Sequence, residues 1–390
     1  MQASGVQMRT LIGVLLLAET ALCAAGAKQP CMPEFPFHDG WFGADAGYSI
    51  PLAGGQTLWL FDDSFVGTPK NQNRSGTKMI NSTIGISSCD SEGKFTISYL
   101  WTGQGTRHPG AIFPPAPPQY KYWPEHGFTH GKDVYVALKM IRDRPDISGA
   151  FAWEAIGARL ARIRNVERPF AEWRIDYFDL YRGRVFPGFW IIKDGGYVYL
   201  FSPADAGGSQ HSATLLTRFP EAVLDAEPAQ IKLDYLAGDD SWKPIGPTGI
   251  DFADAKRVMD DPFGADSVWY EPERKQWVAV GLDAPFRSNQ AVMRTAPALF
   301  GPWSPPEVVY RMPEADPNTP GWDKDTWCYA AMAHPEYESH GRILITYACN
   351  SFDFGKQVRN LGIYVPRAVY VQLPRAVGTP AQRWSSDHPR

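Results

Sequence analysis

The chain has 390 residues, a formal net charge of -4 at pH 7 and 13% aromatic residues. Because nucleic-acid binding requires a basic face that pairs with phosphates, this charge argues against a nucleic-acid partner. The 36 glycines and 34 prolines are spread along the chain without low-complexity repeats, which indicates many turns rather than disorder.

Residues 1–27 have the pattern of a signal peptide. An apolar segment runs from Leu11 to Ala18, and Ala25-Gly26-Ala27 fits a small-x-small cleavage site. The apolar segment is too short to remain as a membrane anchor, so no transmembrane span is expected. We expect cleavage and export to the periplasm or the outside. Lipid anchoring at Cys23 is less favoured, because Leu22 stands where a small residue is expected.

Cleavage leaves four cysteines: Cys31, Cys89, Cys328 and Cys349. An even number in an exported protein permits two disulfides, with three possible pairings. Cys328–Cys349 is the favoured pair, because both residues lie in one predicted hairpin. Free buried thiols are the alternative.

Residues 40–66 predict the first β-hairpin. An apolar strand ends at Leu52, glycines form the turn, and a second apolar strand runs from Thr57 to Phe61. The start of one strand and the end of the next lie at the same edge of an antiparallel pair. Asp45 is therefore expected close to Asp62 or Asp63.

Four more apolar, aromatic strands follow turns further along the chain, and third and fourth strands follow most of these hairpins. This repetition predicts an all-β fold, a five-bladed β-propeller with four-stranded antiparallel blades around a central channel. The single domain spans residues 28–376, followed by a flexible tail at 377–390. The expected blades are 34–110, 111–178, 179–245, 246–313 and 322–376.

Loops at one mouth of a propeller build its binding site, so polar residues near the blade edges are candidates. Glycosidic cleavage requires two carboxyl groups, and clustering of like charges raises the pKa of one of them. Aromatic rings can stack on sugars, although each such ring can equally belong to the core. The catalytic candidates are Asp45, Asp63 and Glu336. The substrate-binding candidates are Trp41, Asn81, Trp123, Glu125, Arg294, His334 and Asn350.

Several residues here resemble the DUF5005 and DUF4185 families, whose members begin "GGDGAYSVPL…WLFGDTF". The matching segments are Gly43-Ala44-Asp45-Ala46-Gly47-Tyr48-Ser49-Ile50-Pro51-Leu52 and Leu58-Trp59-Leu60-Phe61-Asp62-Asp63-Ser64-Phe65, with shorter matches up to about residue 372. The resemblance implies a five-bladed propeller akin to arabinanase-like glycosidases. Some DUF4185-like proteins are endo-acting D-arabinanases, which makes arabinan or a related furanoside polymer a candidate substrate.

By matching position, Asp45 corresponds to the first-blade aspartate of these families and Asp63 to the aspartate of the "GDT" motif. Asp62 replaces the usual glycine, and Ser64 replaces the threonine. The match does not identify the general acid, for which Glu336 is the first choice and Glu125 the second.

The sequence thus predicts an exported glycoside hydrolase, monomeric and without a cofactor, that binds a carbohydrate polymer or oligosaccharide. Asp45 would be the base or nucleophile, and Asp63 would tune a pKa or act as a second catalytic carboxylate. A non-catalytic carbohydrate-binding propeller is the main alternative. A metal-dependent hydrolase with an ion bound by Asp45, Asp63 and His334 is a third possibility.

Overall fold

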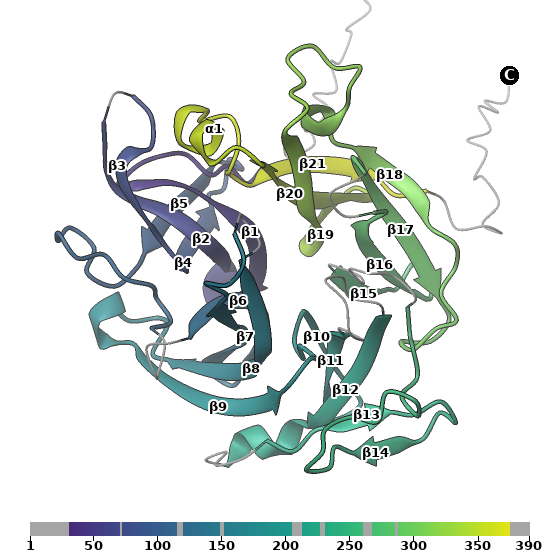
Figure 1. Ribbon diagram of the computed structural model, residues 1–390. Coiled ribbons are helices and arrows are strands. Elements are labelled where there is room, and N and C mark those ends of the chain that lie inside the picture. Colours follow the sequence, from purple (N-terminus) through teal and green to yellow (C-terminus); the bar gives the residue numbers. More distant parts are fainter. Residues whose placement is uncertain are drawn as a thin grey trace, which may run out of the picture.

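The computed structural model describes residues 31–70, 72–114, 120–148, 152–204, 213–226, 231–259, 267–284 and 288–374. The predicted signal peptide with Cys23 and the predicted tail lie outside these residues. Five antiparallel sheets are arranged in a ring, which confirms the predicted five-bladed propeller (Figure 1). Two sheets have four strands, as predicted, whereas two have five strands and one has three.

Blade I has the strand order β1-β2-β4-β5, with β3 paired to the far end of β2. Blade II has the regular order β6-β7-β8-β9, with each strand antiparallel to the next. Their strands are β1 (Trp41–Pro51), β2 (Gln56–Lys70), β3 (Ser75–Ile80), β4 (Thr83–Cys89), β5 (Phe95–Leu100), β6 (Lys121–His130), β7 (Asp133–Asp143), β8 (Trp153–Arg164) and β9 (Arg174–Arg182).

Blades III and IV continue in chain order, and two short strands extend the outer edge of blade III. Blade V has three strands and carries the short helix α1 between its second and third strands. The elements are β10 (Trp190–Asp194), β11 (Tyr197–Ala204), β12 (Ala213–Pro220), β13 (Asp234–Leu236), β14 (Trp242–Pro244), β15 (Ser267–Glu271), β16 (Gln276–Leu282), β17 (Gln290–Ala296), β18 (Glu307–Arg311), β19 (Thr326–Ser339), β20 (Arg342–Ser351), α1 (Phe354–Arg359) and β21 (Arg367–Gln372).

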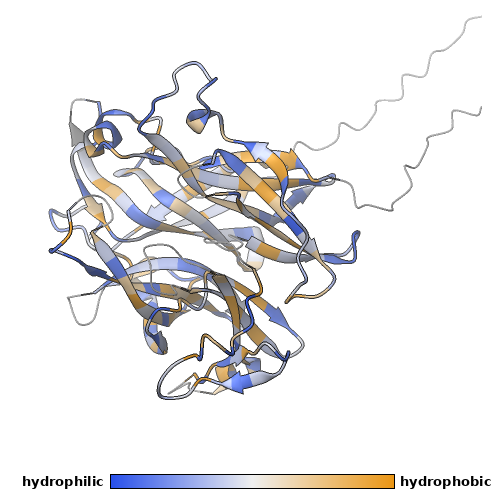
Figure 2. Ribbon diagram, turned by 45° about the vertical axis from the view of Figure 1, so that its right-hand side comes forward, coloured by the Kyte–Doolittle hydropathy of each residue, from blue (hydrophilic) through white to orange (hydrophobic). Residues whose placement is uncertain are grey.

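The first strand of each blade lines the centre of the ring. Strands β1, β6, β10, β15 and β19 each contact the next in this order, and β19 contacts β1 to close the circle. Hydrophobic and hydrophilic residues alternate along many strands, as expected when side chains point to opposite faces of a sheet (Figure 2). The apolar faces of adjacent blades pack on each other and form the core.

Two disulfides hold blades I and V. Cys328 and Cys349 face each other across β19 and β20, and their bond confirms the favoured pairing. Cys31 is bonded to Cys89 at the end of β4, so the alternative of free thiols is wrong for all four cysteines. The hydroxyl of Tyr370 on β21 donates to the carbonyl of Cys31 at 3.1 Å, which ties the segment before β1 to blade V.

The described part of the chain contains no helix with the length and apolar character needed to cross a bilayer.

Candidate functional site

Three of the central strands are distorted where they approach one another. Register shifts interrupt β1 between Ala44 and Tyr48, β6 between Pro124 and Gly127, and β19 between Tyr329 and Met332. A β-bulge turns side chains away from the regular alternation of a strand, and bulges are frequent beside active sites. The bulges carry Asp45, Glu125 and Tyr329 respectively, so each distorted strand places one polar side chain at the same site.

Left-handed backbone accompanies these bulges. Ala46 and Ala330 have φ angles of 62° and 52°, and Tyr364, in the loop before β21, has a φ of 57°. Residues with a Cβ rarely adopt such angles, and strain of this kind is concentrated at functional sites. Gly43 is required for close packing as well, because a Cβ there would lie 2.3 Å from the carbonyl oxygen of Tyr364.

Asp45 lies opposite Asp62 and Asp63, as the hairpin pattern predicts, since Ala44 pairs with Ser64 and Ala46 with Phe61. The Tyr329 hydroxyl donates to Asp45 Oδ2 at 2.6 Å, whereas Asp45 Oδ1 is buried without a hydrogen-bond partner. Burial, and then the negative charge of Asp63, raise the pKa of Asp45 to about 7.

Asp62 and Asp63 differ in their surroundings. Burial raises the pKa of Asp62 well above its usual value, and the charges of Asp45 and Glu125 raise it further. Asp62 Oδ1 is buried and lacks a hydrogen-bond partner. Burial also raises the pKa of Asp63, but two donors oppose the shift. These are Asn81 Nδ2 at 2.9 Å and Trp123 Nε1 at 3.1 Å from Asp63 Oδ1.

Glu125 completes the acidic cluster from blade II. It is buried, accepts a hydrogen bond of 2.7 Å from the Tyr48 hydroxyl and forms an ion pair with Lys139. The Lys139 ammonium also lies 5.4 Å from the ring centre of Phe189. A buried carboxylate is tolerated when an opposite charge and hydrogen bonds compensate for lost hydration. Lys139 and Tyr48 therefore both engage the Glu125 carboxyl group.

A hydrogen-bond chain connects this cluster to α1. Asn350 Nδ2 donates to the Tyr329 hydroxyl at 3.4 Å, and the side-chain oxygen Oδ1 of Asn350 accepts from Gln357 of α1.

Tyr364 lies beside the same cluster. Burial, and then the negative charges of Asp45 and Asp63, raise the pKa of Tyr364 well above its ordinary value, so this phenol stays neutral.

The structure thus assembles Asp45, Asp63, Asn81, Trp123, Glu125 and Asn350 from the predicted set. It adds Tyr48, Asp62, Lys139, Tyr329 and Tyr364. Asp62 and Tyr48 lie in the predicted hairpin, so the pairing of its two strands could have indicated their positions. Lys139 is on β7, the second strand of blade II, where it pairs with Trp123. Tyr329 adjoins the register shift of β19, and Tyr364 has a left-handed backbone, and neither feature leaves a periodic signal in the sequence.

Glu336 and His334 lie elsewhere along the ring. Glu336 accepts a hydrogen bond from Ser49, and the His334 ring binds Ser49 and Thr346 at 2.5 and 2.7 Å. Ser49 is four residues beyond Asp45 on β1, a distance of roughly 10–13 Å along a strand. Burial lowers the pKa of His334 to about 3, so this ring is neutral and fully engaged. The structure does not bring Glu336 or His334 into the acidic cluster.

Two predicted substrate contacts lie outside the acidic cluster. Trp41 is 0% exposed, stacks on Tyr99 at 4.1 Å and donates to Thr83, so it belongs to the core of blade I. Arg294 is on β17, the third strand of blade IV, and not on one of the central strands. The sequence around these two residues did not indicate either position.

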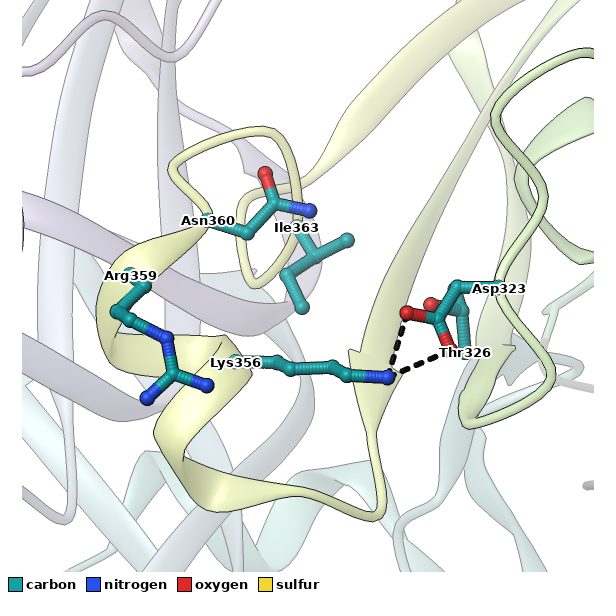
Figure 3. A pocket seen from close by; sticks show the side chains of 6 residues that line it. All are labelled: Asp323, Thr326, Lys356, Arg359, Asn360 and Ile363. Atoms are coloured by element: carbon teal, nitrogen blue, oxygen red, sulfur yellow. Dashed lines mark hydrogen bonds and ion pairs between the residues drawn. The ribbon is translucent and has the colours of Figure 1, made fainter.

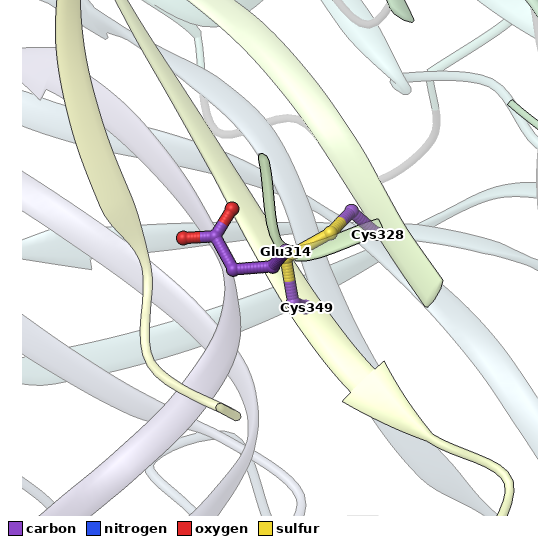
Figure 4. Close-up of side chains that lie close together, drawn as sticks. All are labelled: Glu314, Cys328 and Cys349. Carbon is purple, nitrogen blue, oxygen red and sulfur yellow. A yellow bond between two sulfur atoms is a disulfide. The ribbon is translucent and has the colours of Figure 1, made fainter. Parts of the chain in front are cut away.

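A search of the described residues for clustered metal ligands finds only Glu314, Cys328 and Cys349. Their ligand atoms lie within 4.8 Å of one another, but the two sulfurs are bonded to each other beside Glu314 (Figure 4). A disulfide offers no thiolate, and thiolate is the form in which cysteine binds metal. The proposed ligand set of Asp45, Asp63 and His334 is not assembled, because His334 binds Ser49 and Thr346.

Comparison with solved structures finds the same fold in a Bacteroides ovatus ATCC 8483 protein described provisionally as a hydrolase. The TM-score is 0.64 at 15% identity, covering 85% of this chain and 86% of that one. A levansucrase of B. megaterium matches at a TM-score of 0.43 and 12% identity, over 90% and 94% of the two chains. An α-L-arabinofuranosidase of Podospora anserina matches at 0.39 and 13%, over 88% and 94%.

A comparison with curated proteins finds no match. The family model described as a domain of unknown function, DUF5005, matches residues 35–372. This match covers most of the chain and confirms the resemblance seen in the first hairpin. The chain therefore belongs to the DUF5005 family.

Proposed function

We propose that the protein is a glycoside hydrolase whose catalytic carboxyl groups are Asp45 and Asp62. One observation carries the proposal: a single hairpin places two carboxyl groups together, and each has one buried oxygen without a hydrogen-bond partner. Burial and neighbouring negative charges raise the pKa of Asp45 to about 7 and the pKa of Asp62 well above its usual value. Two carboxyl groups this close do not readily ionise together, so one can serve as the acid while the other serves as the base.

In this mechanism Asp62, whose raised pKa favours the protonated form, donates its proton to the glycosidic oxygen as the bond to the anomeric carbon breaks. Ionised Asp45 acts on the other side, either as the base that takes a proton from the attacking water or as the nucleophile. Burial raises the pKa of Asp63, but the hydrogen bonds from Asn81 and Trp123 favour its ionised form beside Asp45. This charge holds the pKa of Asp45 high.

Glu336 is the general acid expected from the sequence, and the proposal transfers that role to Asp62. The reason is position, because Glu336 is bonded to Ser49 and lies further along β1 than Asp45. Glu125, the second choice, is paired with Lys139. The ion pair occupies Glu125 with Lys139 rather than leaving it free for a substrate, which disfavours it as the acid.

The substrate proposed is arabinan or a related furanoside polymer, following the family resemblance in the first hairpin. Export is part of the proposal and is supported by two disulfides, since such bonds persist mainly in oxidising compartments. Trp123 lies beside Asp63, and its indole is a suitable surface for a sugar ring near the carboxyl groups.

The test is release of reducing sugar from a panel of arabinans and other plant and bacterial cell-wall polysaccharides. We expect wild-type activity on at least one furanoside polymer, and a loss of at least about 1,000-fold in Asp45→Asn and in Asp62→Asn. Asp194→Asn, at the exposed last residue of β10, is the matched control and should keep full activity. Binding without cleavage by the wild type would favour a carbohydrate-binding propeller instead, and activity retained in Asp45→Asn would exclude the proposed base.

A further inference from the structure

The rim of blade V beside the acidic cluster carries unusually exposed aromatic rings. Phe354 and Phe352 are 57% and 54% exposed, the highest values among large apolar side chains of the described residues. Trp322, in the loop before β19, is 40% exposed. Exposed apolar groups that gather on one rim indicate a binding surface more often than scattered single residues do.

These rings form a path toward the cluster. The ring centres of Phe352 and Trp327 are 5.6 Å apart, and those of Trp327 and Tyr329 are 4.5 Å apart. Tyr329 in turn donates to Asp45. Phe354 approaches the site by a second route, since its ring lies 6.3 Å from Phe65. Aromatic contacts therefore continue from the exposed rim to the carboxyl group proposed as the base.

A cavity of about 530 Å³ opens on the same rim (Figure 3). Its size is within the range of small-molecule sites. The Lys356 side chain extends from α1 to Asp323, and its Nζ lies 2.7 and 2.6 Å from the two carboxylate oxygens. The Arg359 side chain is 65% exposed. The cavity is lined by Asp323, Thr326, Lys356, Arg359, Asn360 and Ile363.

The cavity adjoins the acidic cluster at three points. Thr326 is three residues before Tyr329 on β19, about 10 Å along the strand. Ile363 directly precedes Tyr364, whose pKa responds to Asp45 and Asp63. Gln357, next to Lys356 in α1, donates to Asn350 of the hydrogen-bond chain. Neighbouring backbone and buried hydrogen bonds thus link the walls of the cavity to the acidic cluster.

We propose that this rim is a distal subsite for a polysaccharide chain, which leaves the acidic cluster over blade V. Phe352 and Phe354 stack on the apolar faces of its sugars, and the charged and amide groups of the cavity bind hydroxyl groups. Aromatic faces beside convergent hydrogen-bonding groups suit a ligand that is apolar on its faces and polar at its edges, as a sugar is. The inference rests on the proposed function. Such a subsite makes the enzyme selective for long chains.

The first experiment compares polymer with short oligosaccharide as substrate. In Phe352→Ala/Phe354→Ala we expect kcat/KM for the polymer to fall at least tenfold more than kcat/KM for a di- or trisaccharide. Phe352→Ala alone, which removes no contact to Phe65, should show a smaller change in the same direction. Phe252→Ala removes a ring that is 45% exposed between β14 and β15, and should leave both values unchanged. An unchanged ratio of the two substrates in the double variant would overturn the inference.

A second experiment separates this inference from the proposed chemistry. Retardation of Asp45→Asn in gels containing the polysaccharide measures binding without cleavage. We expect retardation that is lost in Asp45→Asn/Phe352→Ala/Phe354→Ala and kept in Asp45→Asn/Phe252→Ala. This result would support the subsite even if the wild type cleaved nothing, which would refute only the hydrolase. The subsite would be overturned if the phenylalanine changes left the retardation unaffected. It would also be overturned if their only effect were to dissociate a dimer, because the rings would then bind a second copy of the chain.

Discussion

The proton affinity of Asp45 depends on a few neighbours that the structure identifies. Burial and the charge of Asp63 raise its pKa to about 7, and the hydrogen bond from Tyr329 acts in the opposite direction. If Asp45 must be ionised to act as base or nucleophile, activity is lost as the pH falls through this pKa. The acidic limb of the pH–rate profile should therefore lie near neutrality.

Replacing Tyr329 with phenylalanine should move that limb. The change removes the donor at 2.6 Å from Asp45 Oδ2, which stabilises the ionised carboxylate. Hydrogen bonds to charged groups contribute about 1.5–3 kcal/mol, so we expect the acidic limb to shift upward by about one pH unit or more. The measurement is kcat/KM between pH 4 and 9, with Tyr270→Phe as control. A downward shift would contradict the assignment of Asp45 as the group that must lose its proton.

At the scale of single residues, the sequence predicts what local pairing controls. Asp45, Asp62 and Asp63 meet because a two-stranded hairpin brings its ends to one edge. The position of Glu336 relative to Asp45 depends instead on how β19 is aligned with β1, and no local sequence pattern predicts that alignment. Trp41 shows a similar limit. The sequence does not distinguish a tryptophan at the end of a strand that packs in the core from one that lies at a binding surface.

Among the elements, the loop between α1 and β21 depends on one buried arginine. Arg74, between β2 and β3, is 1% exposed and donates to five backbone carbonyl groups. One belongs to Phe42 of β1, and the other four lie between Gln357 and Tyr364. Arg74 thus fastens the segment that carries Tyr364 to the strand that carries Asp45.

Arg74→Met is expected to lower the free energy of unfolding by about 2–4 kcal/mol, because buried carbonyl groups lose their donors. Activity should fall as well, since Tyr364 would no longer be fixed beside the acidic cluster. Urea denaturation and kcat/KM measure the two effects. Arg107→Met, at an exposed arginine, is the control. Wild-type stability in Arg74→Met would show that other contacts hold the loop.

The elements were predictable where turn and strand signals repeat, as in the first hairpin of each of the five blades. The number of strands per blade was not, because outer strands such as β13 and β14 have only three residues each. The bulges in β1, β6 and β19 were also not predictable from the sequence. They are imposed by packing among three blades, and the residues that form them differ from one strand to the next.

For the whole molecule, ring closure depends on contacts between the two ends of the described chain. Among the described residues, blade V has three strands. The Tyr370 hydroxyl of blade V donates to the carbonyl of Cys31, and the segment that follows Cys31 packs Phe35 against Trp59 and Phe61 of blade I. The Cys31–Cys89 disulfide fixes the same segment. This closure was outside the reach of the sequence, because it joins residues that no repeat relates.

Removing each disulfide should lower the free energy of unfolding by an amount that follows the length of chain it closes. The separations are 58 residues for Cys31–Cys89 and 21 for Cys328–Cys349. The chain-entropy relation gives about 4 and about 3 kcal/mol respectively. Urea denaturation of Cys31→Ala/Cys89→Ala and Cys328→Ala/Cys349→Ala tests this, with reduced wild type as reference. A larger loss for the shorter loop would show that local packing, and not loop length, determines the effect.

The contact between Tyr370 and Cys31 has a consequence for the order of blades along the chain. Asp45 and Tyr329 are 284 positions apart in sequence, yet blades V, I and II are consecutive around the ring. A circular permutant that began at β19 and joined β21 to the segment before β1 would encode the acidic cluster in one uninterrupted stretch. The long-range character of this site thus reflects where the ring is opened, and the geometry itself involves only neighbouring blades.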